Sequence, residues 1–106
     1  MVLPKGEVRK LQLYGGLFRC LSRIYTKNVV NTPNLYTKKA LQRIISAEFG
    51  VADSRAINSK LTFAITKNFI FINTKGYSIN PDITKFYKKF KEKQKDYLDE
   101  FEIEYL

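Results

Sequence analysis

Apolar residues recur at helical spacing in four stretches of this chain, and two short β-rich runs lie between the third stretch and the fourth. In the first stretch, Val8 to Thr26, they return every three or four positions, which is typical of a helix with one buried face. Gly15 and Gly16 lie inside it, and each costs about 1 kcal/mol of helix stability relative to alanine. We expect the pair to mark a kink or the close approach of another helix. Residues 1–7 are expected to be an extended lead-in.

The second helical stretch carries clear start and stop signals. Thr37 is a suitable N-cap, and the buried stripe of the helix begins shortly after it. Gly50 is the kind of residue that ends a helix in the left-handed conformation. The pattern therefore predicts a helix over Lys38–Phe49.

A third helix is predicted over Asp53–Lys67, close behind the second. Either Asp53 or Ser54 can cap its N-terminus, and Asn68 can take the left-handed conformation that follows its last turn. Its apolar stripe leaves a small, polar and basic face on the opposite side. That face carries Arg55, Asn58, Ser59, Thr62 and Thr66.

The two β-rich runs, Phe69–Ile72 and Tyr77–Ile79, predict a hairpin around a short turn with glycine at Gly76. Pro81 is expected to end it. The connector before the second helix contains Val29 and Val30, which are candidates for a one- or two-residue strand beside the hairpin.

Residues 82–101 form the fourth helical stretch, and we expect it either to pack across the first helix or to pair with a second copy in a homodimer. The predicted domain division is 1–81 for the main domain and 82–106 for a C-terminal helix and tail. Residues 96–106 hold five acids and no base. Overall the pattern predicts an α+β fold that is mostly α.

Charge narrows the choice of partner. The formal charge is +9, and residues 1–95 carry all 19 lysines and arginines against five acids, which gives +14. A body this basic attracts polyanions, of which nucleic acid is the commonest in a cell. A highly charged surface that serves solubility is the alternative.

The residue types present give little support for a catalytic function. There is no histidine, Cys20 is the single cysteine, and no glycine-rich phosphate loop is present. We expect no enzyme activity, no cofactor and no metal. No run is long and apolar enough for a membrane span, so the expected compartment is cytoplasmic (nucleoid-associated) or nuclear.

The order of helix, turn with Gly50-Val51, polar-faced helix, apolar strand, basic turn and strand resembles the winged helix-turn-helix family. The run Phe49-Gly50-Val51 through Ser54-Arg55, Ile57 and Leu61 is a frequent form of the family's turn and recognition helix. Two positions depart from the family's pattern: Ala64 is small, and Ala52 stands where a capping serine or threonine is usual.

The resemblance implies three helices, a two-stranded β-hairpin wing and an additional C-terminal helix. It also implies that helix 53–67 enters the major groove of double-stranded DNA and that the wing, residues 73–76, contacts the backbone or minor groove. Arg55 is then the candidate for guanine and Asn58 for adenine. The full set of candidate contacts is Lys38, Lys39, Arg43, Ser54, Arg55, Asn58, Ser59, Thr62 and Lys75.

The resulting interpretation is a DNA-binding protein, sequence-specific or architectural, most simply a transcriptional regulator. A homodimer would form through the first and C-terminal helices. The alternative is a winged-helix protein–protein adaptor that uses its basic surface and the acidic, aromatic tail 96–106, and a third hypothesis is an RNA-binding module. The tail can equally be expected to dock on a partner or to fold back on the basic body and compete with DNA.

Overall fold

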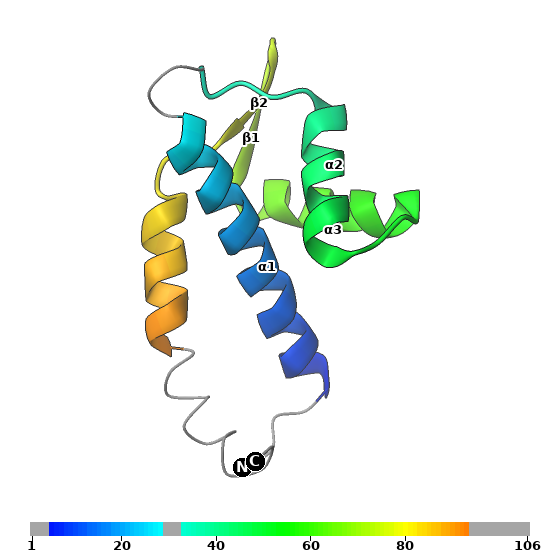
Figure 1. Cartoon of the computed structure of the whole chain (residues 1–106), viewed down its shortest axis with the longest axis vertical. Coiled ribbons are helices and arrows are strands. Elements are labelled where there is room, and N and C mark those ends of the chain that lie inside the picture. The colour runs from blue at the N-terminus through cyan, green and yellow to red at the C-terminus, as the bar shows by residue number, and fades with distance from the viewer. Residues whose placement is uncertain (1–4, 29–32, 94–106) are drawn as a thin grey trace.

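Helices make up most of the fold, and a two-stranded antiparallel hairpin follows the third of them (Figure 1). The computed structural model describes residues 5–28 and 33–93. A last helix covers residues 83–93 of this part, and we call it the C-terminal helical segment. The predicted mostly-α fold with one hairpin is therefore confirmed. The elements are α1 (Lys5–Asn28), α2 (Lys38–Phe49), α3 (Ser54–Thr66), β1 (Ile70–Asn73) and β2 (Gly76–Ile79).

The first helix is longer than its apolar pattern indicates. It begins at Lys5, so the extended lead-in predicted for residues 5–7 is wrong. Glu7 lies in the first turn, where a carboxylate interacts favourably with the positive end of the helix dipole. The helix continues to Asn28, and the strand considered at residues 29–30 falls outside the described residues.

Local capping fixes α2 and α3 where the sequence places them. The Thr37 hydroxyl accepts a hydrogen bond from the backbone N–H of Ala40 at 3.1 Å. Gly50 ends α2 with φ of 62°. The cap of α3 is Asp53, whose carboxylate accepts from the backbone N–H of Arg55 at 3.2 Å. The predicted bounds of α2 are confirmed, and α3 is one residue shorter at each end than predicted.

The hairpin pairs Ile70 with Ile79 at its base and Asn73 with Gly76 at its tip. Asn68 has φ of 62°, so the predicted left-handed residue after α3 is confirmed. A third backbone segment joins the hairpin: Tyr36 and Tyr77 exchange N–H···O bonds of 2.7 and 2.9 Å.

The connector before α2 is also tied to β2 by a side chain. The Asn34 amide donates to the carbonyl of Ile79 at 2.7 Å and accepts from its N–H at 2.9 Å. These two bonds and the Tyr36 bridge anchor a segment that is more than 40 residues away in sequence from β2.

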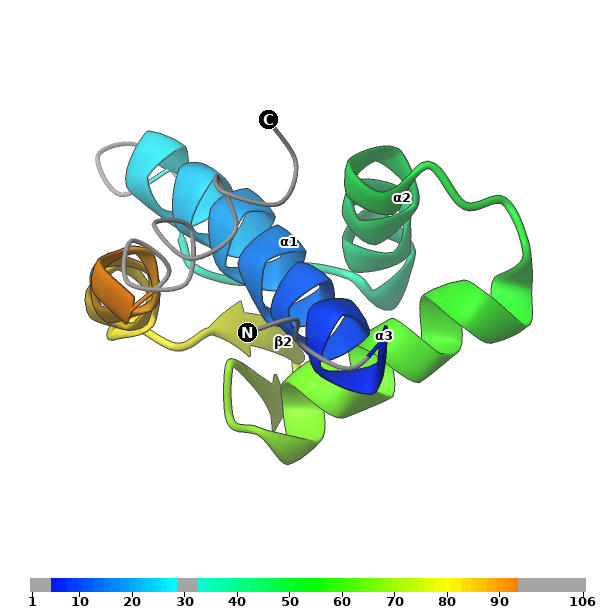
Figure 2. The same ribbon diagram turned by 90° about the horizontal axis from the view of Figure 1, so that it is seen from below.

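The centre of the fold is α1, which lies between α2 on one side and the C-terminal helical segment on the other (Figures 1 and 2). Three of its residues, Leu17, Cys20 and Leu21, are fully buried. The remaining members of the buried apolar core are Phe18, Leu41, Ile45, Leu61, Ala64, Phe69, Ile70, Ile79 and Ile83.

Within residues 5–28 and 33–93, every helix is too short or too polar to cross a membrane.

The glycine pair in α1 is where both neighbours approach it. A Cβ atom placed on Gly16 would overlap the ring of Phe49, at the end of α2. A Cβ atom placed on Gly15 would lie 3.1 Å from the ring of Phe90, in the C-terminal helical segment. The close approach of another helix, one of the two explanations for the pair, is therefore confirmed, and it applies on both sides.

The C-terminal helical segment packs on α1 through aromatic rings. The centroid of the Phe18 ring lies 5.5 Å from that of Phe90 and 6.3 Å from that of Phe86. Ile83, in the first turn of the segment, is fully buried in the same core as α1. Of the two expected placements, packing across the first helix is therefore present within the single chain.

We predict that Gly16→Ala destabilises the protein by about 1 kcal/mol. The methyl group overlaps the Phe49 ring, and overpacking costs about 1–3 kcal/mol. The gain in helix propensity, about 1 kcal/mol, offsets part of this cost. Chemical denaturation measures the change. The matched control is Gly6→Ala, also in α1, where no atom lies within 4 Å of the added carbon and stability should hold or rise. A Gly16→Ala variant as stable as the parent would contradict the close approach.

We also predict a loss of stability in alkali that depends on Cys20. Burial, with a contribution from the Glu48 carboxylate, raises the pKa of the Cys20 thiol to about 12. The unfolded chain releases the same proton near pH 8.5, so unfolding becomes more favourable by up to about 1.4 kcal/mol per pH unit between the two values.

The readout is the difference in unfolding free energy between the parent and Cys20→Ala, measured from pH 8 to 10.5. This difference should shrink by about 2.5 kcal/mol as the pH rises. Titration of the exposed lysines is common to both proteins and cancels. A constant difference would show that the thiol is not buried in the folded state.

Candidate nucleic-acid interface

The outer face of α3 is polar and open to solvent. Ile57, Leu61 and Ala64 hold the helix to the core from its inner side. Side chains on the outer side therefore point away from the core, and all five candidates on this helix are exposed. These exposed candidates are Ser54, Arg55, Asn58, Ser59 and Thr62.

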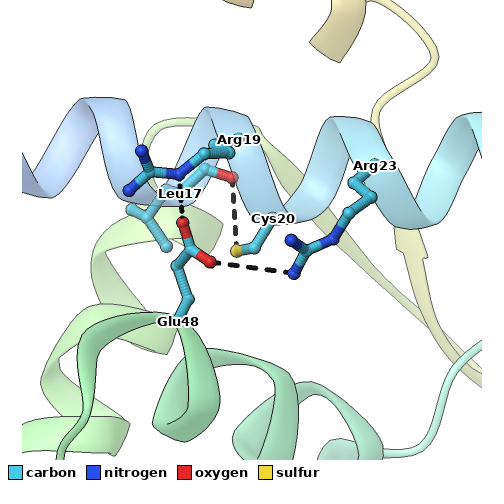
Figure 3. Close-up of polar contacts among 5 residues, drawn as sticks. All are labelled: Leu17, Arg19, Cys20, Arg23 and Glu48. Carbon is cyan, nitrogen blue, oxygen red and sulfur yellow. Dashed lines mark hydrogen bonds and ion pairs between the residues drawn. The ribbon is translucent and has the colours of Figure 1, made fainter.

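Residues 38–67, which contain α2 and α3, include six basic residues and two acidic ones. Both acids serve the fold. Asp53 caps α3. Glu48 extends from α2 towards α1, where it contacts Arg19 and Arg23 beside the buried Cys20 (Figure 3). The α2–α3 pair therefore offers positive charge to solvent with little negative charge to oppose it.

Glu48 is nearly buried, whereas the two arginines that it contacts are exposed. The Glu48 side chain is 9% exposed, whereas those of Arg19 and Arg23 are 60% and 63% exposed. Arg19 Nε donates a short hydrogen bond to one carboxylate oxygen, and Arg23 Nη2 lies 3.7 Å from the other. The bond to Glu48 raises the pKa of the Arg19 guanidinium, which stays charged throughout the physiological range.

Basic side chains of α2 lie beside α3. Lys38, Lys39 and Arg43 are all exposed. Lys39 and Arg43 line a shallow groove of about 350 Å³ that also includes Ile57 of α3. The structure thus brings two of the predicted phosphate contacts to the junction between the two helices.

A hydrogen bond that the sequence pattern does not predict spans this junction. Gln42 of α2 donates through Nε2 to Oδ1 of Asn58 on α3, at 2.7 Å. The bond engages the oxygen through which an asparagine side chain accepts from N6 when it contacts adenine. The signal in the sequence was the position of Gln42 between Lys39 and Arg43, on the exposed side of α2.

Other candidates lie apart from the junction. Ser59 borders a second groove of about 350 Å³, which faces α1 and includes Arg9 and Lys60. Lys75 is exposed in the turn of the hairpin, at the opposite end from the α3–β1 connection. The structure therefore groups Lys39, Arg43 and Asn58, and places Ser59 and Lys75 elsewhere.

The chain was compared with family models, with curated proteins and with solved structures, and none of them matched. Its function is therefore inferred from its own side chains and their geometry. Two properties stand out in α2 and α3: exposed hydrogen-bond donors on one helix, and a basic surface whose nearby carboxylates are occupied.

We predict that Glu48→Gln destabilises the protein by about 1 kcal/mol, because the amide cannot satisfy two arginines as an anion does. The cost is modest because both guanidinium groups remain largely solvated. Thermal or chemical unfolding gives the value, and raising the salt concentration should reduce the difference. Glu7→Gln, an exposed change in the first turn of α1, is the control and should cost less than about 0.5 kcal/mol. An equal cost for both would show that Glu48 does not brace α1 against α2.

Proposed function

We propose that this chain binds double-stranded DNA in the manner of a winged helix-turn-helix protein, with α3 as the recognition helix. The observation that carries the proposal is the α2–α3 pair, which presents an exposed polar and basic face while its two carboxylates are held in structural contacts. The element order also supports it, because a tight turn at Gly50 joins the helices and a hairpin with an exposed lysine comes after them.

Arg55 is the proposed base-reading residue. It lies in the first turn of α3, where recognition helices contact base edges, and its side chain is exposed. Its backbone N–H is bonded to the Asp53 cap, which fixes where the side chain leaves the helix. A guanidinium there can donate to both N7 and O6 of guanine.

We assign the phosphate contacts to the exposed basic side chains of α2. Lys38 and Lys39 begin the helix, and Arg43 lies one turn later. Charges of this kind fix the register of a protein on the duplex and carry no sequence information by themselves. Ser54, Ser59 and Thr62 supply short hydroxyl donors, and Lys75 supplies the contact from the hairpin.

Asn58 has a dual role in this proposal. In the unbound chain its Oδ1 accepts from Gln42, and on DNA the same oxygen would accept from adenine. Exchange of one partner for the other would keep the oxygen satisfied in both states. The biological role that fits is a transcriptional regulator or an architectural protein. A homodimer would place two copies of α3 on half-sites one helical turn apart.

We predict salt-dependent binding to duplex DNA that depends on Arg55. With several phosphates contacted, the logarithm of the association constant should fall steeply and linearly with the logarithm of salt concentration. On a duplex enriched from a random pool, Arg55→Ala should weaken binding by about 5- to 150-fold, corresponding to about 1–3 kcal/mol. Fluorescence anisotropy provides both measurements.

Two controls separate base reading from charge. Arg55→Lys keeps the charge and loses the planar fork, so it should lose most of the preference for the enriched duplex while binding random duplex normally. Lys88→Ala removes an exposed charge from the C-terminal helical segment and should change affinity less than about twofold. Absence of duplex binding at about 50 mM salt would overturn the proposal and favour the protein–protein adaptor.

A further inference from the structure

An apolar groove of about 620 Å³ lies between α1 and the C-terminal helical segment. Leu11 and Tyr14 of α1 form one wall, and Phe86 and Phe90 form the other. Phe69, which lies just after α3, closes the base. None of the residues proposed to contact DNA lines this groove.

Aromatic rings dominate the surface of the groove. Tyr14, Phe86 and Phe90 are each partly exposed, and Tyr14 packs at 6.0 Å from Phe69 between ring centroids. A concave apolar hollow with aromatic walls is the usual form of a binding site on a folded protein.

The rim of the groove is positively charged. Lys67, Lys89 and Lys93 contribute three ammonium groups, against the single carboxylate of Glu92. An occupant with an apolar body and several carboxylates would match both the walls and the rim.

The same chain contains a segment with these properties. Residues 96–106 carry five acids, no base and six large apolar side chains. The acids alternate with apolar residues from Glu100 to Tyr105, so one side of the segment can be apolar while the other is acidic. Its apolar residues are Tyr97, Leu98, Phe101, Ile103, Tyr105 and Leu106.

The segment also begins at the right place. Lys93, the last described residue, itself lines the groove, and two residues separate it from residue 96. The wall formed by α1 from Leu11 to Phe18 rises about 10 Å, whereas eleven residues span about 16 Å as a helix and about 36 Å when extended. A short covalent link gives an effective concentration on the order of millimolar, which favours this occupant over a free partner.

We propose that residues 96–106 dock into the groove between α1 and the C-terminal helical segment of their own chain, with the apolar side chains on the aromatic wall and the carboxylates beside Lys67, Lys89 and Lys93. The contact covers the aromatic surface and neutralises part of the basic body. It does not depend on DNA binding, since it uses none of the α2 or α3 residues assigned to that role.

The first test compares the full-length protein with the double variant Phe101→Ser, Ile103→Ser by amide NMR. Loss of docking should shift the signals of Leu11, Tyr14 and Phe86, which line the groove, and leave those of Lys38 and Arg43 in place. The groove should also bind the dye ANS with about twofold or greater fluorescence in the variant, because its aromatic surface is uncovered. Shifts confined to the neighbours of residues 101 and 103 would overturn the proposal.

The second test concerns the charges. In the full-length protein, Lys89→Glu with Lys93→Glu should reproduce the groove shifts and the rise in ANS fluorescence, and high salt should do so in part. The matched control, Lys38→Glu with Lys39→Glu, makes the same charge change on α2 and should do neither. Equal effects of both pairs would show that net charge, and not the rim of the groove, is responsible.

The third test identifies which copy supplies the segment. Docking within one chain predicts groove signals that are independent of protein concentration, and the same oligomeric state in sedimentation for the parent and the Phe101→Ser, Ile103→Ser variant. Groove signals that change on dilution, together with a dimer that the variant abolishes, would overturn the proposal in favour of exchange between two copies. Groove signals that are unchanged in every variant would show that residues 96–106 do not occupy the groove, and would also overturn the proposal.

Discussion

Two adjacent glycines in α1 set the positions of the helices around it. Gly16 accommodates the ring of Phe49, so the end of α2 can reach the surface of α1. Gly15 accommodates the ring of Phe90, so the C-terminal helical segment can do the same from the other side. Any side chain at either position would push a neighbour outwards. Since α3 comes after α2 with only a short turn between them, the orientation of the polar face of α3 depends on this contact, and Lys60 of α3 lies over the same Phe49 ring.

Electrostatics reinforces this packing and also leaves a particular surface behind. Glu48 binds Arg19 and Arg23 of α1 within one residue of Phe49 and thereby fastens the same end of α2. These ion pairs hold a carboxylate against α1 that would otherwise lie next to the basic residues of α2. Asp53 is similarly engaged as a cap. Stability and surface charge thus share a cause at Glu48, which is turned towards α1, whereas Asp53 stays exposed beside Arg55.

Contacts between near neighbours were accessible from the sequence, and those between distant segments were not. Thr37 and Gly50 act on the ends of their own helix, so the bounds of α2 were predictable from residue type alone. The Tyr36 bridge to Tyr77 and the Asn34 clamp on Ile79 join residues more than 40 positions apart, and neither has a local signature. Within the candidate site, the outward direction of Arg55 is a consequence of helical periodicity. The start of α1 was misjudged because Pro4 and Gly6 are turn formers locally, whereas the helix around Gly6 is sustained by the longer amphipathic stretch after it.

The Gln42–Asn58 hydrogen bond couples the effects of substitutions at two positions on different helices. It joins residues sixteen positions apart and depends on how α2 crosses α3. Replacing Asn58 alone would leave the Gln42 amide without its acceptor, and replacing Gln42 alone would free an oxygen of Asn58. The energetic effects of the two substitutions should not add, because residues in direct contact couple. A library that recodes the surface of α3 one residue at a time would therefore undervalue position 58, and pairs of changes at 42 and 58 are the natural steps by which such a surface could diverge.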